Sequence, residues 1–206
     1  MDAFHPLIAN WFDERYGEPT EIQREAWREI SLGNHALISA PTGSGKTLAA
    51  FLWALDRLIV GAWSPEEVRV LYVSPLKALN NDIRTNLLVP LGELRRRFAE
   101  AGQPFPDIRI MTRSGDTTQS ERRRMTRQPP SILITTPESL NILLTSDRGR
   151  TLFGGITTVI LDEIHAVAGS KRGSHLMTAV ERVRLLSDNS GEFQRIALSA
   201  TVRPME

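Results

Sequence analysis

The sequence predicts an α/β fold in which a parallel β-sheet carries helices on both of its faces. Short β-branched runs alternate along the chain with helical patterns, as in a sheet built from repeated β–α units. Several runs are apolar at consecutive positions, as expected for strands that are buried on both faces. The expected strands are Ala36–Ala40, Val68–Ser74, Ile108–Thr112, Ser131–Thr135, Thr157–Asp162 and Gln194–Ser199.

The expected helices lie before the first strand and between the later ones. His5–Tyr16 and Glu21–Ser31 come first, and Thr20 is a good N-cap for the second helix because Gln23 follows it at the capping-box position. The other long helical patterns are Lys46–Gly61, Leu76–Ala101 and Ser174–Leu186. Ligands of such folds bind at the carboxyl ends of the strands, so the residues after each strand are candidate site residues.

The composition indicates a single soluble domain that spans residues 1–206. The chain is 41% hydrophobic and 24% charged, which suffices for a core without metals or disulfides. The absence of cysteine excludes a disulfide framework and a thiolate metal site. Residues 1–7 lack the pattern of a secretion signal, and the longest charge-free apolar stretch, Leu48–Leu55, is too short to cross a membrane. We therefore expect a cytoplasmic protein with no membrane partner.

The charge is balanced, with 25 Lys and Arg against 24 Asp and Glu. This balance excludes a clamp that holds nucleic acid by bulk charge, but it allows a local basic groove. Arg95–Arg97 and Arg122–Arg124 are either solvated helix faces or nucleic-acid contacts, and the same alternatives apply to Lys171–Arg172.

The strongest motif is APTGSGKT at residues 40–47, which follows an expected strand and opens an expected helix. It is a phosphate-binding loop with alanine in place of the usual first glycine. Gly43 and Gly45 allow the backbone N–H groups to face a phosphate, and the helix N-terminus adds a partial positive charge. Lys46 is placed to reach the β- and γ-phosphates, and the Thr47 hydroxyl to bind Mg²⁺. The predicted contacts of ATP in this loop are Thr42, Gly43, Ser44, Gly45, Lys46 and Thr47.

A second motif is an apolar strand that ends in two carboxylates, VILDEIH at residues 159–165. Asp162 is placed to hold Mg²⁺, because hard cations prefer oxygen ligands. Glu163 is the candidate to orient or deprotonate the water that attacks the γ-phosphate. Alone, such acids can equally be solvated loop residues. Together with the phosphate loop they predict a catalytic site of Glu163, Lys46 and Asp162, with ATP and Mg²⁺ as cofactors.

These motifs resemble those of superfamily 2 helicases in both order and spacing. APTGSGKT, DEIH and Ser199-Ala-Thr201 match motifs I, II and III, while SPLKALN at 74–80 and TTPESL at 135–140 resemble motifs Ia and Ib. More narrowly, SPLKALNNDI, TTPESLNILL and GSKRGSHL at 169–176 resemble the N-terminal RecA-like domain of the large helicase-related (Lhr) family. The resemblance implies a RecA-like P-loop NTPase domain of an ATP-dependent helicase. It also implies 3′ to 5′ movement on single-stranded DNA and a role in DNA repair.

The resemblance also implies a contact with the adenine base. Gln23 matches the Q motif, whose amide reads the adenine edge, although the residues alone allow a capping box instead. The family's upstream aromatic position is occupied by Pro6. The adenine-stacking residue is therefore open between Phe12 and Tyr16.

Further positions are implied to couple hydrolysis to nucleic acid. The coupling residues are His165, Ser199 and Thr201. The implied nucleic-acid contacts are Ser74, Pro75 and Lys77 in motif Ia, Thr136, Pro137 and Glu138 in motif Ib, and Arg113, Gly115 and Asp116 after the third strand. Hydroxyl, backbone N–H and lysine groups there would hold phosphates without reading the base sequence. Lys77 and Arg113 can alternatively be solvated surface charges.

A superfamily 2 motor also needs a second RecA-like domain that supplies arginine fingers, and we expect this domain to be absent from residues 1–206. Because an arginine finger contributes about 10³- to 10⁵-fold in rate, the chain alone should bind nucleotide weakly and hydrolyse it little. A plain P-loop ATPase or transporter motor is an alternative that SAT and TPES disfavour. A non-hydrolysing nucleic-acid-binding module and an RNA helicase are two further alternatives, and phosphate contacts alone do not separate DNA from RNA.

Overall fold

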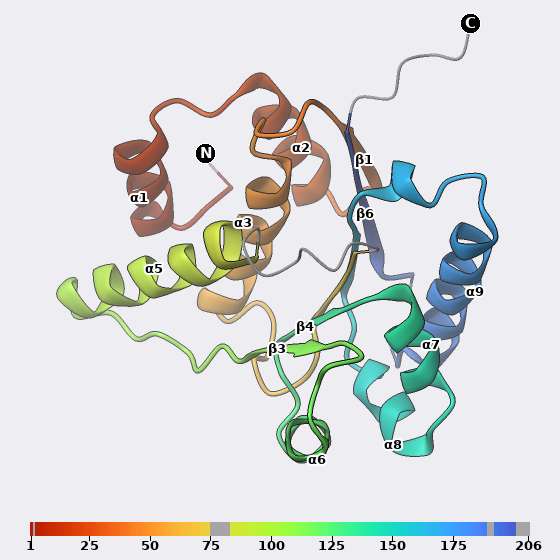
Figure 1. Cartoon of the computed structure of the whole chain (residues 1–206). Coiled ribbons are helices and arrows are strands. Elements are labelled where there is room, and N and C mark those ends of the chain that lie inside the picture. The colour runs from red at the N-terminus through yellow and green to blue at the C-terminus, as the bar shows by residue number, and fades with distance from the viewer. Residues whose placement is uncertain (2, 75–82, 189–191, 201–206) are drawn as a thin grey trace, which may run out of the picture.

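The computed structural model describes residues 1, 3–74, 83–188 and 192–200 of the chain. In this part, six parallel strands form one sheet in the order β1-β6-β5-β2-β4-β3 (Figure 1). The strands are β1 Ala36–Ser39, β2 Val70–Val73, β3 Ile110–Arg113, β4 Ile132–Thr135, β5 Thr158–Leu161 and β6 Gln194–Ser199. The α/β prediction is confirmed, and no strand boundary differs from its expected position by more than two residues.

Helices cover both faces of this sheet. Helices α1, α2, α3 and α5 lie on one side of the strands, and α7, α8 and α9 lie on the other (Figure 1). The α-helices are α1 Pro6–Tyr16, α2 Glu21–Ser31, α3 Lys46–Ile59, α5 Val89–Glu100, α6 Gln119–Arg127, α7 Pro137–Leu144, α8 Asp147–Arg150 and α9 Lys171–Leu186. The shorter helices are η1 Arg84–Leu88, η2 Thr151–Phe153 and η3 Ile164–Ala166. Within the described residues, none of the helices is long and apolar enough to cross a membrane.

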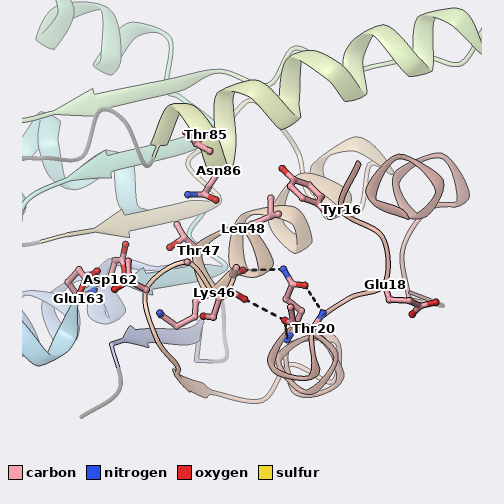
Figure 2. Close-up of a pocket in the computed structure, with 15 residues that line it drawn as sticks. Tyr16, Glu18, Thr20, Lys46, Thr47, Leu48, Thr85, Asn86, Asp162 and Glu163 are labelled. Atoms are coloured by element: carbon pink, nitrogen blue, oxygen red, sulfur yellow. Dashed lines mark hydrogen bonds between the residues drawn. The ribbon is translucent and has the colours of Figure 1, made fainter. Parts of the chain in front are cut away.

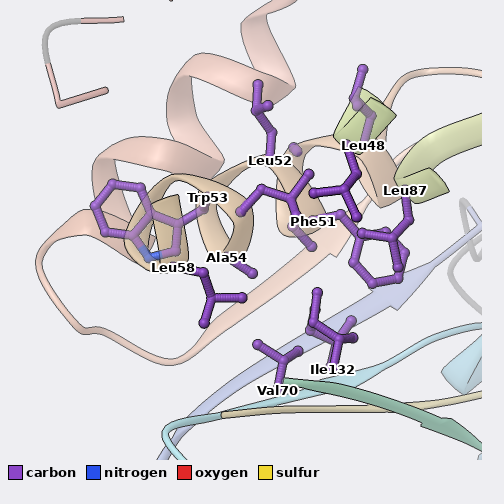
Figure 3. Close-up of a cluster of buried hydrophobic side chains, with 14 of the residues drawn as sticks. Leu48, Phe51, Leu52, Trp53, Ala54, Leu58, Val70, Leu87 and Ile132 are labelled. Carbon is purple, nitrogen blue, oxygen red and sulfur yellow. The ribbon is translucent and has the colours of Figure 1, made fainter. Parts of the chain in front are cut away.

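Successive residues of the strands supply two separate hydrophobic cores. In β2, Val70 and Tyr72 belong to the core that includes α1, α2, α3 and α5, whereas Leu71 and Val73 belong to the core with α7 and α9. This alternation explains why the strand sequences are apolar at consecutive positions. Figure 3 shows Phe51 of α3 pointing toward the strands that carry Val70 and Ile132 in the first of these cores.

Helix α3, which follows the phosphate loop, is buried around most of its circumference. It packs against α2 and η1, and the Trp27 indole N–H of α2 donates to the carbonyl of Ala49 at 3.0 Å. Burial of each large apolar side chain contributes roughly 1.5–3 kcal/mol, so α3 is held firmly between the sheet and its neighbouring helices. The start of α3 is therefore a rigid base for the loop before it.

Two expected helices differ from the structure. Within the stretch Leu76–Ala101, η1 is a π-helical turn that leads into α5, while residues 75–82 lie outside the description. Pro90 explains the irregular turn, because it lacks the N–H that would bond the carbonyl of Asn86 in a regular helix. The last helix begins at Lys171 and not at Ser174, because the Ser170 side chain accepts from the Gly173 N–H and caps it.

Candidate functional site

The candidate residues gather at the carboxyl edge of the sheet, because all six strands run in the same direction. Ala40, Asp162 and Ser199 lie at the ends of β1, β5 and β6, which are neighbours in the sheet. Ser74 and Thr136 follow β2 and β4 in the other half. One half of this edge thus carries the predicted nucleotide-binding and coupling residues, and the other half carries the predicted nucleic-acid contacts.

A cavity of about 490 Å³ lies beside the first half. Every residue that the sequence predicts to contact nucleotide lines it: Gln23, Thr42, Gly43, Ser44, Gly45, Lys46, Thr47, Asp162 and Glu163. Figure 2 shows the two acids on one side of Lys46, with Glu18 and Tyr16 at the far end of the cavity. The cavity thus has a basic, loop-lined centre, an acidic side and an aromatic end.

The phosphate loop has the backbone shape that an anion site requires. Gly43 and Gly45 have φ angles of 82° and 84°, in the left-handed region that glycine adopts without steric cost. Gly45 is the N-cap of α3 and makes no side-chain cap bond, so the first N–H groups of the helix can be satisfied by an anion. The Ser44 hydroxyl is buried, without a hydrogen-bond partner among the described residues. These groups fit a bound phosphate.

Lys46 is a buried cation, with 8% of its surface exposed. Its ammonium group donates to the carbonyls of Ala40 at 2.5 Å and Pro41 at 2.9 Å. Burial lowers the pKa of Lys46, although the nearby carboxylates of Glu163 and Asp162 act to raise it. A desolvated ammonium held by neutral carbonyls can gain from an anion placed in the loop.

Asp162 is held in place by backbone and side-chain contacts. Its N–H donates to the Val73 carbonyl at 2.8 Å, and one carboxylate oxygen, Oδ1, accepts from the Glu163 N–H at 2.8 Å. The hydroxyl of Tyr72 donates to the other oxygen, Oδ2. The carboxylate is therefore oriented before any ligand binds.

Glu163 is the one non-glycine residue of the described chain with a left-handed backbone, at φ 50° and ψ 39°. Such a conformation costs about 1–3 kcal/mol, and residues that adopt it cluster at functional sites. Here it turns the chain directly after Asp162, and both acids line the cavity.

His165 connects the acidic loop to the end of β6. Its Nδ1 accepts from the Ala200 N–H at 3.2 Å, which requires that the proton of a neutral ring sits on Nε2. Nε2 lies 3.2 Å from Glu163 Oε2, and the Ser199 hydroxyl lies 3.4 Å from Nδ1. The structure therefore brings His165 and Ser199 together, while Thr201 lies outside the described residues.

Gln23 forms the capping box of α2. Its Oε1 accepts from the Thr20 N–H at 3.0 Å, and its own N–H donates to the Thr20 hydroxyl at 3.3 Å. The side-chain nitrogen of Gln23, Nε2, faces the phosphate loop and donates to the Gly45 carbonyl at 3.4 Å. The capping-box interpretation is thus confirmed, and adenine reading by Gln23 remains a prediction.

The aromatic end of the cavity contains Tyr16, which is 43% exposed. Phe12, the other residue considered for adenine stacking, is 1% exposed and packs against Trp27 in the core. The cavity is also lined by residues that the sequence did not predict: Glu18, Thr20, Leu48, Thr85 and Asn86. Thr85 and Asn86 come from the π-helical turn, a feature that often marks functional sites, and Pro90 is its signal in the sequence.

In the other half of the edge, Arg113 is 4% exposed and donates to the Ser114 carbonyl. Burial and the nearby Arg122 guanidinium lower its pKa. The alternative of a solvated surface charge is therefore wrong for Arg113. Arg122 donates to the Gly115 carbonyl at 3.2 Å and shapes this loop, in which Asp116 is exposed.

The ends of β2 and β4 are bonded to each other, because the Ser74 N–H donates to the Thr135 carbonyl at 3.1 Å. Thr136 caps α7 and Pro137 takes its first position, which suits a residue without an N–H. Glu138 is exposed and pairs with Arg172 of α9 at 2.8 Å.

Opposing effects act on the pKa of Glu138. Partial burial raises this pKa, but the residue's own N–H and the Arg172 guanidinium outweigh burial and hold it below its ordinary value. A hollow of about 350 Å³ lies beside this pair and is lined also by Lys171 and His175. Pro75 and Lys77 lie outside the described residues.

The first arginine triplet makes contacts within the fold. Arg97 pairs with Glu14, and Arg95 lies 5.6 Å from the centre of the Phe105 ring. Arg96 lies 4.0 Å from Glu100, one turn along the same helix. These contacts favour a structural face over a nucleic-acid contact.

A glycine-rich loop between a strand and a helix, a buried lysine, and two acids after another strand of a parallel sheet define a P-loop NTPase domain. Residues 20–206 match the family model of the DEAD/DEAH box helicases. The chain therefore belongs to the DEAD/DEAH box helicase family.

The relatives of this chain narrow the family. It is 52% identical, over its whole length, to the Lhr helicase/probable uracil glycosylase of Mycolicibacterium smegmatis, and 48% identical, over 98% of its length, to the Lhr helicase/uracil glycosylase of Escherichia coli. It spans 14% and 13% of the lengths of those proteins. The solved structure of Mycobacterium smegmatis Lhr bound to ssDNA and AMP-PNP has a TM-score of 0.89 and 51% identity, and the match covers 98% of this chain and 25% of that one. Within the family, the chain groups with the Lhr helicases.

Proposed function

We propose that this chain is the ATP-binding motor domain of an ATP-dependent nucleic-acid helicase or translocase. The observation that carries the proposal is the meeting of Lys46, Thr47, Asp162 and Glu163 in one cavity beside the phosphate loop. The Lhr relative solved with AMP-PNP supports ATP as the nucleotide.

The residues of the cavity fit a nucleotide with Mg²⁺. The loop N–H groups, the buried Ser44 hydroxyl and the buried ammonium of Lys46 would hold the phosphates. The Thr47 hydroxyl and the Asp162 carboxylate are the oxygen ligands that Mg²⁺ prefers. When bound, Mg²⁺ would neutralise charge on the β- and γ-phosphates. Gln23 and Tyr16 are then the candidates to contact the base.

Glu163 is the residue that would orient or deprotonate the attacking water. Its carboxylate lies 3.2 Å from His165, which in turn accepts from the N–H of Ala200 after β6. A shift at the end of β6 would therefore move the imidazole ring that lies beside the Glu163 carboxylate. We propose His165 and Ser199 as coupling residues on this basis, and Thr201 on the match to motif III alone.

Nucleic acid would bind along the half of the edge formed by β2, β4 and β3. The proposed contacts are Ser74, Pro75, Lys77, Arg113, Gly115, Asp116, Thr136, Pro137 and Glu138. The ssDNA-bound Lhr relative favours single-stranded DNA over RNA. From the sequence and its motifs we further propose 3′ to 5′ movement, a role in DNA repair and a cytoplasmic location. Phosphate contacts alone would also accept RNA, which makes an RNA helicase the second candidate.

A second RecA-like domain of the same polypeptide is the partner that would complete this site. Its arginine fingers would stabilise charge in the transition state, an effect of about 10³- to 10⁵-fold in rate where measured. The 206-residue chain, as a single RecA-like domain, would then bind nucleotide weakly and turn it over slowly. Robust DNA-stimulated ATPase activity of the purified monomer would contradict this.

The test is an ATPase assay of the polypeptide that includes the second domain, with single-stranded DNA or RNA. We expect stimulation by DNA, lost in Lys46→Ala and in Glu163→Gln. Glu163→Gln should still bind a fluorescent ATP analogue, which separates a lost base from a lost nucleotide site. Equal stimulation by RNA would overturn the DNA assignment, and unchanged turnover in Glu163→Gln would overturn the assignment of the base.

A further inference from the structure

Tyr72 lies inside the sheet and reaches the candidate metal-binding acid from a neighbouring strand. It is 1% exposed and sits on β2, directly opposite Ile160 of β5. Two residues beyond Ile160, Asp162 points to the same face of the sheet, because side chains alternate along a strand. There the Tyr72 hydroxyl donates to Asp162 Oδ2.

Asp162 is therefore held from two sides by two different elements. Glu163 N–H, in the turn after β5, donates to Oδ1 at 2.8 Å, and Tyr72 of β2 donates to Oδ2. One fixed donor on each oxygen defines both the position and the plane of the carboxylate. A carboxylate oxygen can accept more than one bond, so a hydrogen-bond donor and a metal ion can share it.

The ring of Tyr72 is in turn fixed by helix α3. It stacks on Phe51, with ring centroids 4.9 Å apart and an angle of 29° between the planes. Phe51 lies four residues after Thr47, one turn along the same face of the helix, and points from α3 toward the strands (Figure 3). A continuous chain of contacts thus joins the helix that carries Thr47 to the carboxylate of Asp162.

We propose that Tyr72 is a positioning residue which, supported by Phe51, sets the placement of Asp162 relative to Thr47 and so determines how tightly Mg²⁺ is held. The inference rests on the proposed function, in which these two residues are the metal ligands. Loss of a hydrogen-bond partner behind a metal ligand typically costs about 10- to 100-fold in metal affinity.

The test compares the response to Mg²⁺ of the wild-type chain and of Tyr72→Phe, which keeps the stacked ring and removes the hydroxyl. Binding of a fluorescent ADP analogue at a fixed trace concentration is measured while Mg²⁺ is titrated, and once more in EDTA. We expect the Mg²⁺ concentration at half-maximal response to rise about tenfold in Tyr72→Phe. Binding in EDTA should stay within about twofold of wild type, since the loop and Lys46 hold the phosphates.

Control variants separate this inference from the proposed function. Asp162→Asn should lose the Mg²⁺ response, and Tyr72→Phe should change nothing further in that background. Thr158→Val, which removes another buried hydroxyl at the opposite end of β5, should match wild type. Thermal unfolding checks that each variant is folded.

Three outcomes overturn different claims. A wild-type midpoint in folded Tyr72→Phe, with the response lost in Asp162→Asn, would overturn the role of Tyr72 and leave the proposed function standing. A full response in Asp162→Asn would overturn the metal site itself. Phe51→Leu should shift the midpoint in the same direction as Tyr72→Phe, and a wild-type midpoint there would remove Phe51 from the proposal.

Discussion

Gly45→Ala tests whether the phosphate loop and the Gln23 amide are packed as tightly as the structure shows. Gly45 has a φ angle of 84°, and a Cβ atom built there would lie 2.4 Å from Gln23 Nε2 and 3.1 Å from its Cδ. Such contacts are too short, so the amide must move away from the loop. The substitution therefore combines a backbone effect with a displacement of Gln23.

The magnitude follows from these two effects. A left-handed backbone costs an L-residue about 1–2 kcal/mol. Moving the Gln23 amide removes its bond to the Gly45 carbonyl and disturbs the capping box with Thr20, together about 1 kcal/mol. We expect a loss of about 2–3 kcal/mol in the free energy of unfolding. At about 2–4 °C per kcal/mol for a chain of this size, this lowers Tm by about 4–12 °C.

Gly43→Ala is the matched control for the assay, which is thermal or urea unfolding followed by circular dichroism. Gly43 has a φ angle of 82°, and no described atom lies within 4 Å of a Cβ atom built there. It should therefore show the backbone effect alone, about 1 kcal/mol less than Gly45→Ala. In a Gln23→Ala background the two substitutions should cost the same. Equal effects of both in the wild-type background would refute the packing of Gln23 against Gly45.

The predictable part of this site is the part that is local in sequence. Gly43, Gly45 and Lys46 predict a phosphate loop, because glycine allows the backbone turn and lysine supplies the charge that contacts phosphate. The buried strands are recognisable because both faces are apolar, and Asp162 is placed by following one of them to its end. These features need no knowledge of which strands are neighbours.

The unpredicted part depends on contacts between distant elements. In the sequence, Tyr72 cannot be told apart from the apolar residues of its buried strand. Its bond to Asp162 forms because β2 and β5, which are far apart in sequence, are neighbours in the sheet. Thr85 and Asn86 enter the cavity through a π-helical turn, whereas helical periodicity alone predicts a regular helix. Gln23 shows the same limit, because its contact with Gly45 depends on how α2 packs beside the loop.

Three further predictions concern charge and coupling. Burial lowers the pKa of Lys46, so between this lowered pKa and the ordinary value near 10.5 the unfolded chain binds more protons than the folded one. The free energy of unfolding should therefore rise with pH in this window. Unfolding measured across pH should show a flatter slope in Lys46→Met. Arg172→Ala should raise the pKa of Glu138, followed by carbon NMR of the carboxyl group; an unchanged pKa would exclude Arg172 as a cause of the depression. The Arg172–Glu138 ion pair contributes at most about 1 kcal/mol to the free energy of unfolding. This contribution is present above the pKa that Glu138 has in the unfolded chain, and it is lost as pH falls through the lower pKa of the folded chain. His165→Ala should keep nucleotide binding but reduce DNA stimulation of the two-domain ATPase by about 5- to 150-fold, and normal stimulation would remove His165 from coupling.

The position of β5 in the sheet suggests a second coupling route beside His165. On one side, the loop after β5 meets the end of β6 through His165 and Ala200. On the other side, Asp162 meets β2 through Tyr72, two residues before Ser74, which begins the proposed nucleic-acid contacts. A bound nucleic-acid strand that pulls on Ser74 would therefore act on Asp162 through Val73 and Tyr72 of β2. If the two routes are independent, losses of DNA stimulation in Tyr72→Phe and His165→Ala, measured at saturating Mg²⁺, should add in free energy within about 0.5 kcal/mol in the double variant. A double variant no worse than His165→Ala alone would show that both residues act in one route, and wild-type DNA stimulation in Tyr72→Phe would show that the path through Tyr72 carries no signal from the nucleic acid.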